Sequence, residues 1–475
     1  MSLDYDLVII GNTLEAFFAA FHAVKLKARV ALVLGETKNN CYTEIARFTF
    51  NYFTFLDKHW QNLTQWDIDN QSVGKLNITQ IKTWLKQSKK DIQEYYFLEK
   101  LAVLGVDIIH DTGEFCRLPQ LGFVLKNRTL RSRRYLLAMG SISTIPKIQG
   151  LSEVGYLTIE SLEIDKLPHS LLILSQTPIG IELAQQLNSL GKQVTLVVED
   201  NNILPQEDSD AVQIIQAKLE AEGINLLSNS TISQVRKIES KKWIQAGNQA
   251  IEIDEIILIT HGKPNIEGLN LEGVKVEQKA NSIQINNKLQ TTNPNVYACG
   301  SITGGYDLSN IAQYEASVAV KNAIFYPLFQ VNYHYHPFRI FTNPILSRVG
   351  LTETQAKQRY DNDLVIIKQN YKTLAKAKIL DETTGFCKII TRRNGIILGC
   401  HIIGNNSDEI INLVALAIKN NIKIQKISQL FPSHCTSSEI LSQISQSWKD
   451  KIFQDNRLLN DCLETLLFWR RKWNC

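Results

Sequence analysis

The sequence has no pair of cysteines in the CxxC spacing that zinc sites use. Its eight cysteines are instead scattered along 475 residues, at Cys41, Cys116, Cys299, Cys387, Cys400, Cys435, Cys462 and Cys475. This distribution argues against a metal site built on cysteines and against a secreted disulfide scaffold. We therefore expect reduced thiols and a cytoplasmic location.

Long apolar runs are also missing. No run reaches the roughly 18 apolar residues that a membrane-spanning helix needs. The apolar segment LVII near the N-terminus has neither a basic n-region before it nor a small-residue cleavage site after it. The sequence therefore predicts no transmembrane segment and no secretion signal.

An excess of one charge is absent as well. The chain has 51 Lys and Arg residues against 47 Asp and Glu residues, a net charge of +4, with the two signs interspersed. This balance gives no reason to expect a nucleic-acid partner. With 44% hydrophobic and 21% charged residues, the composition is that of a folded globular protein of two to four domains.

A strand-helix-strand pattern occurs twice. The segment DYDLVIIGNTLEAFFAAFHAVKLKARVALVLGE predicts a buried strand, a turn that opens at Gly11, an amphipathic helix to about Lys25 and a second strand from Arg29 to Leu34. The same order recurs in HSLLILSQTPIGIELAQQLNSLGKQVTLVVED, up to Asp200. This duplication predicts an α/β protein with two doubly wound, Rossmann-like domains.

A third region follows from about Tyr333. The alternating pattern of GFCKIITRRNGIILGCHIIG predicts paired strands, and a helix is expected near 408–420, so this region is an α+β domain. Beyond it, apolar residues at helical spacing predict a tail helix with Arg470, Arg471 and Lys472 near its end. We expect this helix to dock on a neighbouring domain or subunit; the alternative is a membrane-surface anchor.

The stretch FPSHCTSSEIL places His434 five residues before Glu439. A carboxylate at this spacing can orient an imidazole as a general acid or base. The alternative is an ordinary surface or core histidine beside helix-capping hydroxyl groups.

Taken together, these segments resemble the flavoprotein pyridine nucleotide-disulfide oxidoreductases, the family of glutathione reductase, dihydrolipoamide dehydrogenase and mercuric reductase. The resemblance covers about Asp4 to Leu441. It implies an FAD-binding-like domain at 1–150 and 285–330, an NAD(P)-binding-like domain at 151–284, a dimerisation domain at 331–441 and a helical tail at 442–475. It also implies a homodimer, in which His434 and Glu439 match the family's acid/base pair.

The family's cysteine pair CxxxxC is incomplete here. Cys41 aligns with the first cysteine, but the second position holds Ala46, and the lysine expected near the flavin is Phe50. The glutamate that partners that lysine matches Glu182. Cys41 is therefore expected to be vestigial, and the chain is a divergent member without the family's disulfide chemistry.

The resemblance also locates the expected FAD contacts. The fingerprint glycines become Gly11, Thr13 and Ala16, and both Thr13 and the neighbouring Glu15 oppose an anion at the helix N-terminus. The family's ribose-binding acid falls on Leu34, with Glu36 as a substitute. The later FAD-contacting turns of the family match Gly140 and the pair Gly300 and Ser301, where Ser301 replaces an aspartate. We expect FAD binding that is weakened or lost.

The fingerprint of the second unit reads Ser175, Thr177 and Gly180. Thr177 before a proline is expected to cap its own helix, which would leave no need for a phosphate. The position of the family's NADP-type arginine holds Glu199, whose charge repels a 2′-phosphate. NAD is therefore favoured over NADP if a nicotinamide nucleotide binds.

Three functional hypotheses follow. The first is an FAD-dependent NAD(P)H oxidoreductase whose acceptor is not a disulfide, such as a quinone, oxygen or a metal ion. The second is a catalytically silent homodimer, a pseudoenzyme that acts as a scaffold or regulator. The third uses Cys435, Cys462 or Cys475 as replacement thiols.

Overall fold

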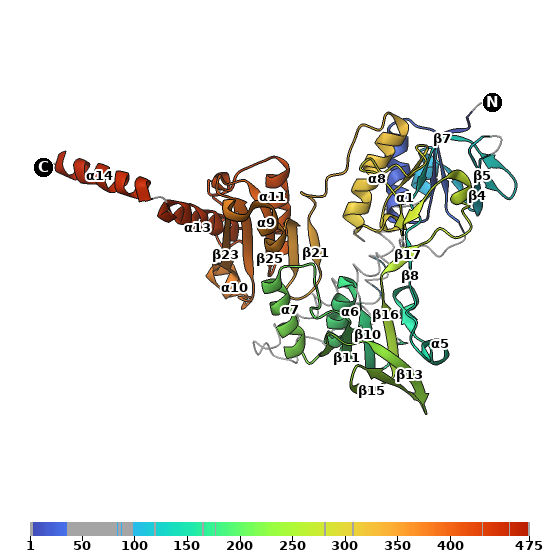
Figure 1. Cartoon of the computed structure of the whole chain (residues 1–475), viewed down its shortest axis with the longest axis horizontal. Helices are drawn as coiled ribbons and strands as arrows, with labels where there is room; N and C mark the ends of the chain where they lie inside the picture. The colour runs from blue at the N-terminus through green and yellow to red at the C-terminus, as the bar shows by residue number, and fades with distance from the viewer. Residues whose placement is uncertain are drawn as a thin grey trace. The chain divides into compact units, whose positions relative to one another are not determined.

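The computed structural model describes residues 3–35, 83, 87, 98–117, 120–163, 166–175, 177–279, 282–305, 308–429, 431–455 and 457–473. These residues form two compact units. The first contains 1–180, 186–197 and 231–332, and the second contains 181–185, 198–230 and 333–475. Figure 1 shows their helices and strands, coloured from blue at the N-terminus to red at the C-terminus.

The first unit opens with a five-stranded parallel sheet. Its order is β20 (Val296–Ala298), β7 (Ser132–Leu137), β1 (Tyr5–Ile10), β2 (Val30–Val33) and β3 (Asp107–Ile109). In the register of the central pairs, Leu7 lies opposite Val30, and Val8 opposite Tyr135. The segments 7–10 of β1 and Val30–Val33 of β2 are apolar and buried because both faces of the sheet are covered.

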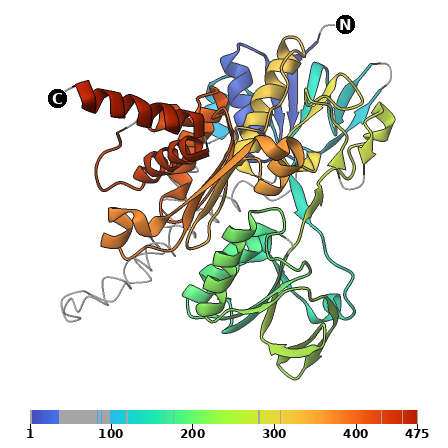
Figure 2. The same ribbon diagram turned by 60° about the vertical axis from the view of Figure 1, so that its left-hand side comes forward.

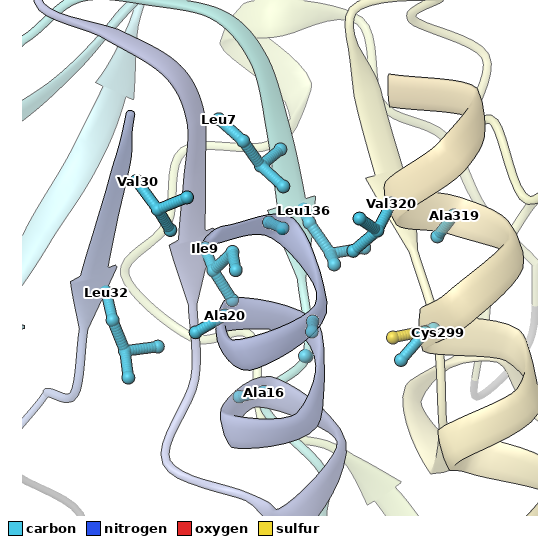
Figure 3. Close-up of a cluster of buried hydrophobic side chains, with 14 of the residues drawn as sticks. Leu7, Ile9, Ala16, Ala20, Val30, Leu32, Leu136, Cys299, Ala319 and Val320 are labelled. Carbon is cyan, nitrogen blue, oxygen red and sulfur yellow. The ribbon is translucent and has the colours of Figure 1, made fainter. Parts of the chain in front are cut away.

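Helices α1 (Leu14–Lys25) and α8 (Ser309–Ile324) supply one covering layer. Figure 3 shows Ile9 and Leu32 of the strands beside the small side chains of Ala16 and Ala20 on α1, with Ala319 on the neighbouring helix. Alanines at these positions let the helix approach the sheet closely.

The opposite face packs on a second apolar cluster. It contains Phe115, Phe123 and Tyr135, whose rings meet edge to face. Two of these aromatic residues come from a small antiparallel sheet in the order β4 (Gly113–Cys116), β5 (Gly122–Leu125) and β6 (Thr129–Leu130).

The second strand-helix-strand repeat is present. Within the first unit its parallel strands lie in the order β11 (Gln193–Val198), β10 (Ser170–Ser175), β16 (Glu255–Ile259) and β9 (Leu157–Thr158), and α6 (Pro178–Ser189) connects β10 to β11. An antiparallel sheet of β13 (Ile232–Ile238), β14 (Lys241–Ala246) and β15 (Gln249–Ile253) follows. The predicted duplication of the dinucleotide-binding fold is confirmed.

The second unit contains the predicted α+β region. Its antiparallel sheet has the order β21 (Phe338–Ile340), β22 (Leu346–Gly350), β25 (Ile397–Ile403), β24 (Phe386–Arg392) and β23 (Leu364–Asn370). Helices α11 (Ser407–Lys419) and α13 (Glu439–Asp455) bury their apolar side chains in its core. Figure 2 shows these strands in orange and the last helices in red.

The remaining elements are short or peripheral. In the first unit they are α4 (Leu98–Val103), β8 (Ser141–Ser143), α5 (Leu151–Val154), β17 (Gly262–Pro264), β18 (Gln278–Lys279) and β19 (Ser282–Ile283). In the second unit they are α7 (Ser209–Ala221), β12 (Asn225–Leu227), α9 (Glu353–Tyr360), α10 (Ala375–Ile379), α12 (Ile424–Ile427) and α14 (Arg457–Trp473). Among the described residues, no helix combines the length and apolarity needed to cross a membrane.

Candidate functional site

The turn between β1 and α1 depends on Gly11. Its φ is +151°, and a Cβ at this position would collide with the carbonyl group of Ala138 at the end of β7. Two further glycines at the ends of strands of this sheet, Gly140 and Gly300, also have positive φ, at +69° and +80°. A positive φ of this kind favours glycine at each of these three turns, which are the turns that the resemblance assigned to FAD.

The N-terminus of α1 is capped by its own sequence. Thr13 has an extended backbone, and its Oγ1 accepts the N–H of Ala16 at 3.3 Å. The same hydroxyl group donates to the carbonyl oxygen of Ala138 at 2.8 Å. One of the helix N–H groups that would otherwise face an anion is thus satisfied by a buried side chain.

Glu15 adds a carboxylate in the first turn of the same helix. Its side chain is buried, and a Cβ on Gly300 would come within 2.5 Å of Glu15 Oε1. The N–H of Gly300 donates to Glu315 Oε2 at 2.8 Å. Burial and the nearby charges of Glu15 and Glu315 raise the pKa of Cys299 well above its usual value. Gly300 therefore lies between two buried carboxylates.

Glu315 was not among the residues predicted for the site. Its signal in the sequence is a single carboxylate at a buried position of the apolar helix SNIAQYEASVAVKNAI. The predicted residue Ser301 begins a short 3₁₀ helix, Ser301–Thr303, directly after Gly300. Ala16 is fully buried at the interface of α1 with the sheet, the position of the fingerprint's third small residue.

The fingerprint of the second strand-helix-strand repeat has a different arrangement. Ser175 Oγ donates to the carbonyl oxygen of Thr177 at 2.8 Å and accepts its N–H at 3.2 Å. Gly180 is needed because a Cβ there would collide with the Ser175 side chain. The Ser175 side chain thus stabilises the turn through two hydrogen bonds to the Thr177 backbone, and Gly180 leaves space for that side chain.

The expectation that Thr177 caps α6 is wrong. Thr177 is at the N-cap with an extended backbone, but its side chain makes no capping hydrogen bond, and its Oγ1 is buried without a partner. The Ser175 hydroxyl group already satisfies the Thr177 backbone. The first turn of α6 contains no acidic residue. This N-terminus fits a phosphate group better than that of α1. The Thr177 hydroxyl group makes no hydrogen bond within the protein, and no carboxylate in the first turn offsets the positive end of the helix dipole.

Glu182 and Glu199 occupy contrasting positions. Glu182, on α6, is buried, and its Oε1 accepts the N–H of Phe341 at 2.8 Å. Gln185 holds the same segment through the N–H and carbonyl groups of Asn343. Glu199 is exposed directly after β11. Glu182 therefore anchors a backbone segment within the second unit, a role that sequence reasoning did not anticipate.

The predicted contact between His434 and Glu439 is present. His434 Nδ1 lies 3.3 Å from Glu439 Oε1, and the His434 side chain is 90% exposed. Glu439 Oε1 also accepts the N–H of Cys435 at 2.7 Å. Cys435 has a φ of +60°, so this bond supports an unusual backbone turn before α13.

Two predicted site residues, Glu36 and Cys41, lie outside the described residues, as does Cys475. The two described candidates for a replacement thiol, Cys435 and Cys462, are exposed. Among the described residues, no group of three or more His, Cys, Asp or Glu side chains is arranged to hold a metal ion.

Comparison with known proteins identifies the fold and the family. Residues 5–316 match the family Pyridine nucleotide-disulphide oxidoreductase, and residues 336–444 match its dimerisation domain. A mercuric reductase of Bacillus cereus is 30% identical over 459 residues, which cover 92% of this chain and 70% of the relative. A dihydrolipoyl dehydrogenase of Synechocystis is 27% identical over 470 residues, covering 93% and 98%. LpdA from Mycobacterium tuberculosis has a similar structure, with a TM-score of 0.82, 21% identity and coverage of 93% and 99%.

This chain therefore belongs to the pyridine nucleotide-disulphide oxidoreductases, a family of FAD-dependent enzymes that use NAD(P)H. The predicted fold, two dinucleotide-binding domains and a dimerisation domain, is confirmed. The dimerisation domain implies a homodimer.

Proposed function

We propose that this protein is an FAD-dependent NAD(P)H oxidoreductase that delivers electrons to an acceptor other than a disulfide. The observation that carries the proposal is the N-terminus of α6, which has no side-chain cap and no acidic residue in its first turn. A helix end of this kind binds the pyrophosphate of a dinucleotide. The family membership supports the same chemistry.

The residues assigned to each nucleotide follow from the two turns. In the domain at 1–150 and 285–330, backbone groups of Gly11, Gly140 and Gly300 would approach FAD, with Ala16 letting α1 pack closely. Thr13 and Glu15 weaken this site because one supplies a cap and the other a negative charge. FAD, when bound, supplies the relay of two electrons between the nicotinamide and the acceptor.

In the domain at 151–284, the hydroxyl group of Thr177 and the N-terminus of α6 would hold the nicotinamide nucleotide. Gly180 keeps the turn open for Ser175. The exposed carboxylate of Glu199 favours NAD over NADP, because it would repel the additional 2′-phosphate.

The acceptor is proposed to be a quinone, oxygen or a metal ion. The sequence CYTEIA offers one thiol, Cys41, where a dithiol mechanism needs two. The mercuric reductases among the relatives make a metal ion the first acceptor to test.

The experiment compares acceptors with the purified, FAD-supplemented protein. NADH oxidation is followed with a quinone, oxygen and Hg(II), and in parallel with glutathione disulfide and lipoamide. We expect turnover with at least one of the first group, none with the disulfides, and no change with Cys41→Ser. Turnover of a disulfide that survives Cys41→Ser and is lost in His434→Ala would overturn the proposal and favour Cys435 or Cys462 as the reactive thiol.

A second candidate, a catalytically silent homodimer, is favoured by one observation. The first helix is already capped by Thr13, and Glu15 places a buried carboxylate beside Gly300. A protein that has replaced its bound phosphate in this way needs no flavin. Purified protein that stays colourless and shows no flavin absorption after incubation with excess FAD would support this candidate against the first.

A further inference from the structure

The C-terminal helix α14, Arg457–Trp473, leaves an apolar face uncovered. Leu463, Leu466, Trp469 and Trp473 follow one another at intervals of three, three and four residues, so they share one side of the helix. Leu466 is 60%, Trp469 63% and Trp473 88% exposed. A contiguous group of large, exposed apolar side chains marks a surface that contacts a protein partner or a membrane.

The preceding helix α13, unlike α14, has its apolar face buried. It buries Ile440, Leu441, Ile444 and Trp448 in the core of the second unit. The match to the family's dimerisation domain ends at residue 444, before α14 begins. The apolar face of α14 is thus neither part of its own unit's core nor part of the matched dimerisation domain.

The end of α14 is basic as well as aromatic. Arg470, Arg471 and Lys472 are exposed in its last turn, between Trp469 and Trp473. Lys472 Nζ lies 4.5 Å above the ring of Phe468. Tryptophan beside lysine and arginine is the composition of helices that lie at the boundary between lipid headgroups and acyl chains.

The position of Arg470 distinguishes a lipid surface from a protein partner. Arg470 is four residues after Leu466 and three before Trp473, so it shares their side of the helix. A protein that covered this face would have to bury the guanidinium group and pair it with an acid. At a bilayer surface the same side chain extends to the phosphate groups while the leucine and tryptophan side chains enter the acyl layer.

We propose that α14 binds the surface of an anionic lipid bilayer as a peripheral anchor. The helix lies parallel to the surface with Leu463, Leu466, Trp469 and Trp473 inserted, and Arg470 pairs with lipid phosphates. Arg471 and Lys472 share the side of Phe468, where they add positive charge that attracts the helix to the anionic surface. Because the dimerisation domain implies two copies, each assembly presents two such helices, and the second binds with the advantage of a high local concentration. This proposal does not depend on the protein's redox activity.

The test is sedimentation of the full-length protein with lipid vesicles. Vesicles of phosphatidylcholine alone are compared with vesicles that contain about one third phosphatidylglycerol, and salt is then raised. We expect binding to the anionic vesicles, a blue shift of tryptophan fluorescence, and weakening with salt. The double variant Trp469→Ser/Trp473→Ser and the charge variant Arg470→Glu should each weaken binding about tenfold or more.

Two control variants distinguish binding through this face from non-specific adsorption to lipid. Phe468→Ser removes an exposed aromatic side chain, 55% exposed, from the opposite side of α14, and Ile379→Ser removes one of 64% exposure from α10. Both should bind vesicles as the unmodified protein does. Absence of binding to either vesicle overturns the proposal, as does equal binding by the tryptophan double variant. It is also overturned if that double variant instead abolishes a higher oligomer, since a second copy then covers the face.

Discussion

The hydroxyl group of Thr13 donates a 2.8 Å hydrogen bond to the carbonyl oxygen of Ala138, which joins the start of α1 to the end of β7. Dinucleotide-binding proteins place a bare backbone at this point of the fold so that a pyrophosphate can approach. Here the Thr13 side chain fills the position and also caps the helix.

Thr13→Gly should raise affinity for FAD and lower stability. Glycine removes the Cβ and frees the N–H of Ala16, while the loss of two hydrogen bonds costs about 1 kcal/mol of the free energy of unfolding. Flavin retained after gel filtration measures the first effect and urea unfolding the second. Thr13→Ser keeps the hydroxyl group and is the control for both. Unchanged flavin retention in Thr13→Gly would show that Glu15 is what limits binding.

Thr177→Ala provides a matched comparison in the second strand-helix-strand repeat. Because Thr177 makes no capping hydrogen bond, its loss should change the free energy of unfolding by less than about 0.5 kcal/mol, whereas Thr13→Ala should cost about 1 kcal/mol. NADH affinity should fall in Thr177→Ala. For the same reason, Thr177→Gly with Ser175→Gly should not raise NADH affinity, as it would if Thr177 capped α6. An increase in NADH affinity would contradict the observation that Thr177 makes no capping hydrogen bond.

In the loop before α13, Glu439 should matter more than His434. His434 is exposed, and an exposed ion pair contributes little, so His434→Ala should change stability by less than about 0.5 kcal/mol. Glu439→Ala also removes the acceptor for the Cys435 N–H and should cost about 1 kcal/mol. Urea unfolding of both variants measures the two effects, and a larger loss in His434→Ala than in Glu439→Ala would contradict this prediction.

His401 should make stability depend on pH. This residue is buried on β25, where burial lowers its pKa to about 4, and its Nε2 donates to the carbonyl oxygen of Leu351 at 3.2 Å. An unfolded histidine has a pKa near 6.5, so between pH 6.5 and about 4 the unfolded chain takes up a proton that the folded chain does not. The free energy of unfolding is therefore highest above pH 6.5 and falls by up to about 3 kcal/mol as the pH decreases to about 4. His401→Gln should flatten the curve of unfolding free energy against pH over this range, and an unchanged slope would assign it to other groups.

Dimerisation should respond to α11 and not to the core of the sheet. Leu413 and Leu416 on α11 are 50% and 57% exposed, whereas Ile402 on β25 is fully buried. Leu413→Asp/Leu416→Asp should yield a folded monomer by light scattering, because charges are poorly tolerated in a buried interface. Ile402→Ala should instead destabilise each subunit by about 2–5 kcal/mol through the cavity it leaves. A dimer that persists in the α11 double variant would place the interface elsewhere.

The sequence alone determined the architecture. Two apolar strand-helix-strand patterns and an alternating third region are local signals, because the period of apolar residues reports directly on which face of each element is buried. The spacing of His434 and Glu439 was also sufficient to predict their contact, since five residues in a short turn cannot separate them widely.

How each of the two fingerprints is used depends on the three-dimensional packing around it. Thr13 and Thr177 stand at the same position of their repeats, yet only Thr13 caps its helix, because Ser175 ties the turn before Thr177. Glu315 on α8 accepts the N–H of Gly300, 15 residues before it in the sequence, and the packing of α8 and α1 on one sheet brings both residues to Glu15 near the start of the chain. A hydroxyl or carboxylate group takes the nearest partner with suitable geometry, and that partner depends on the packing of distant elements, which the local sequence does not contain.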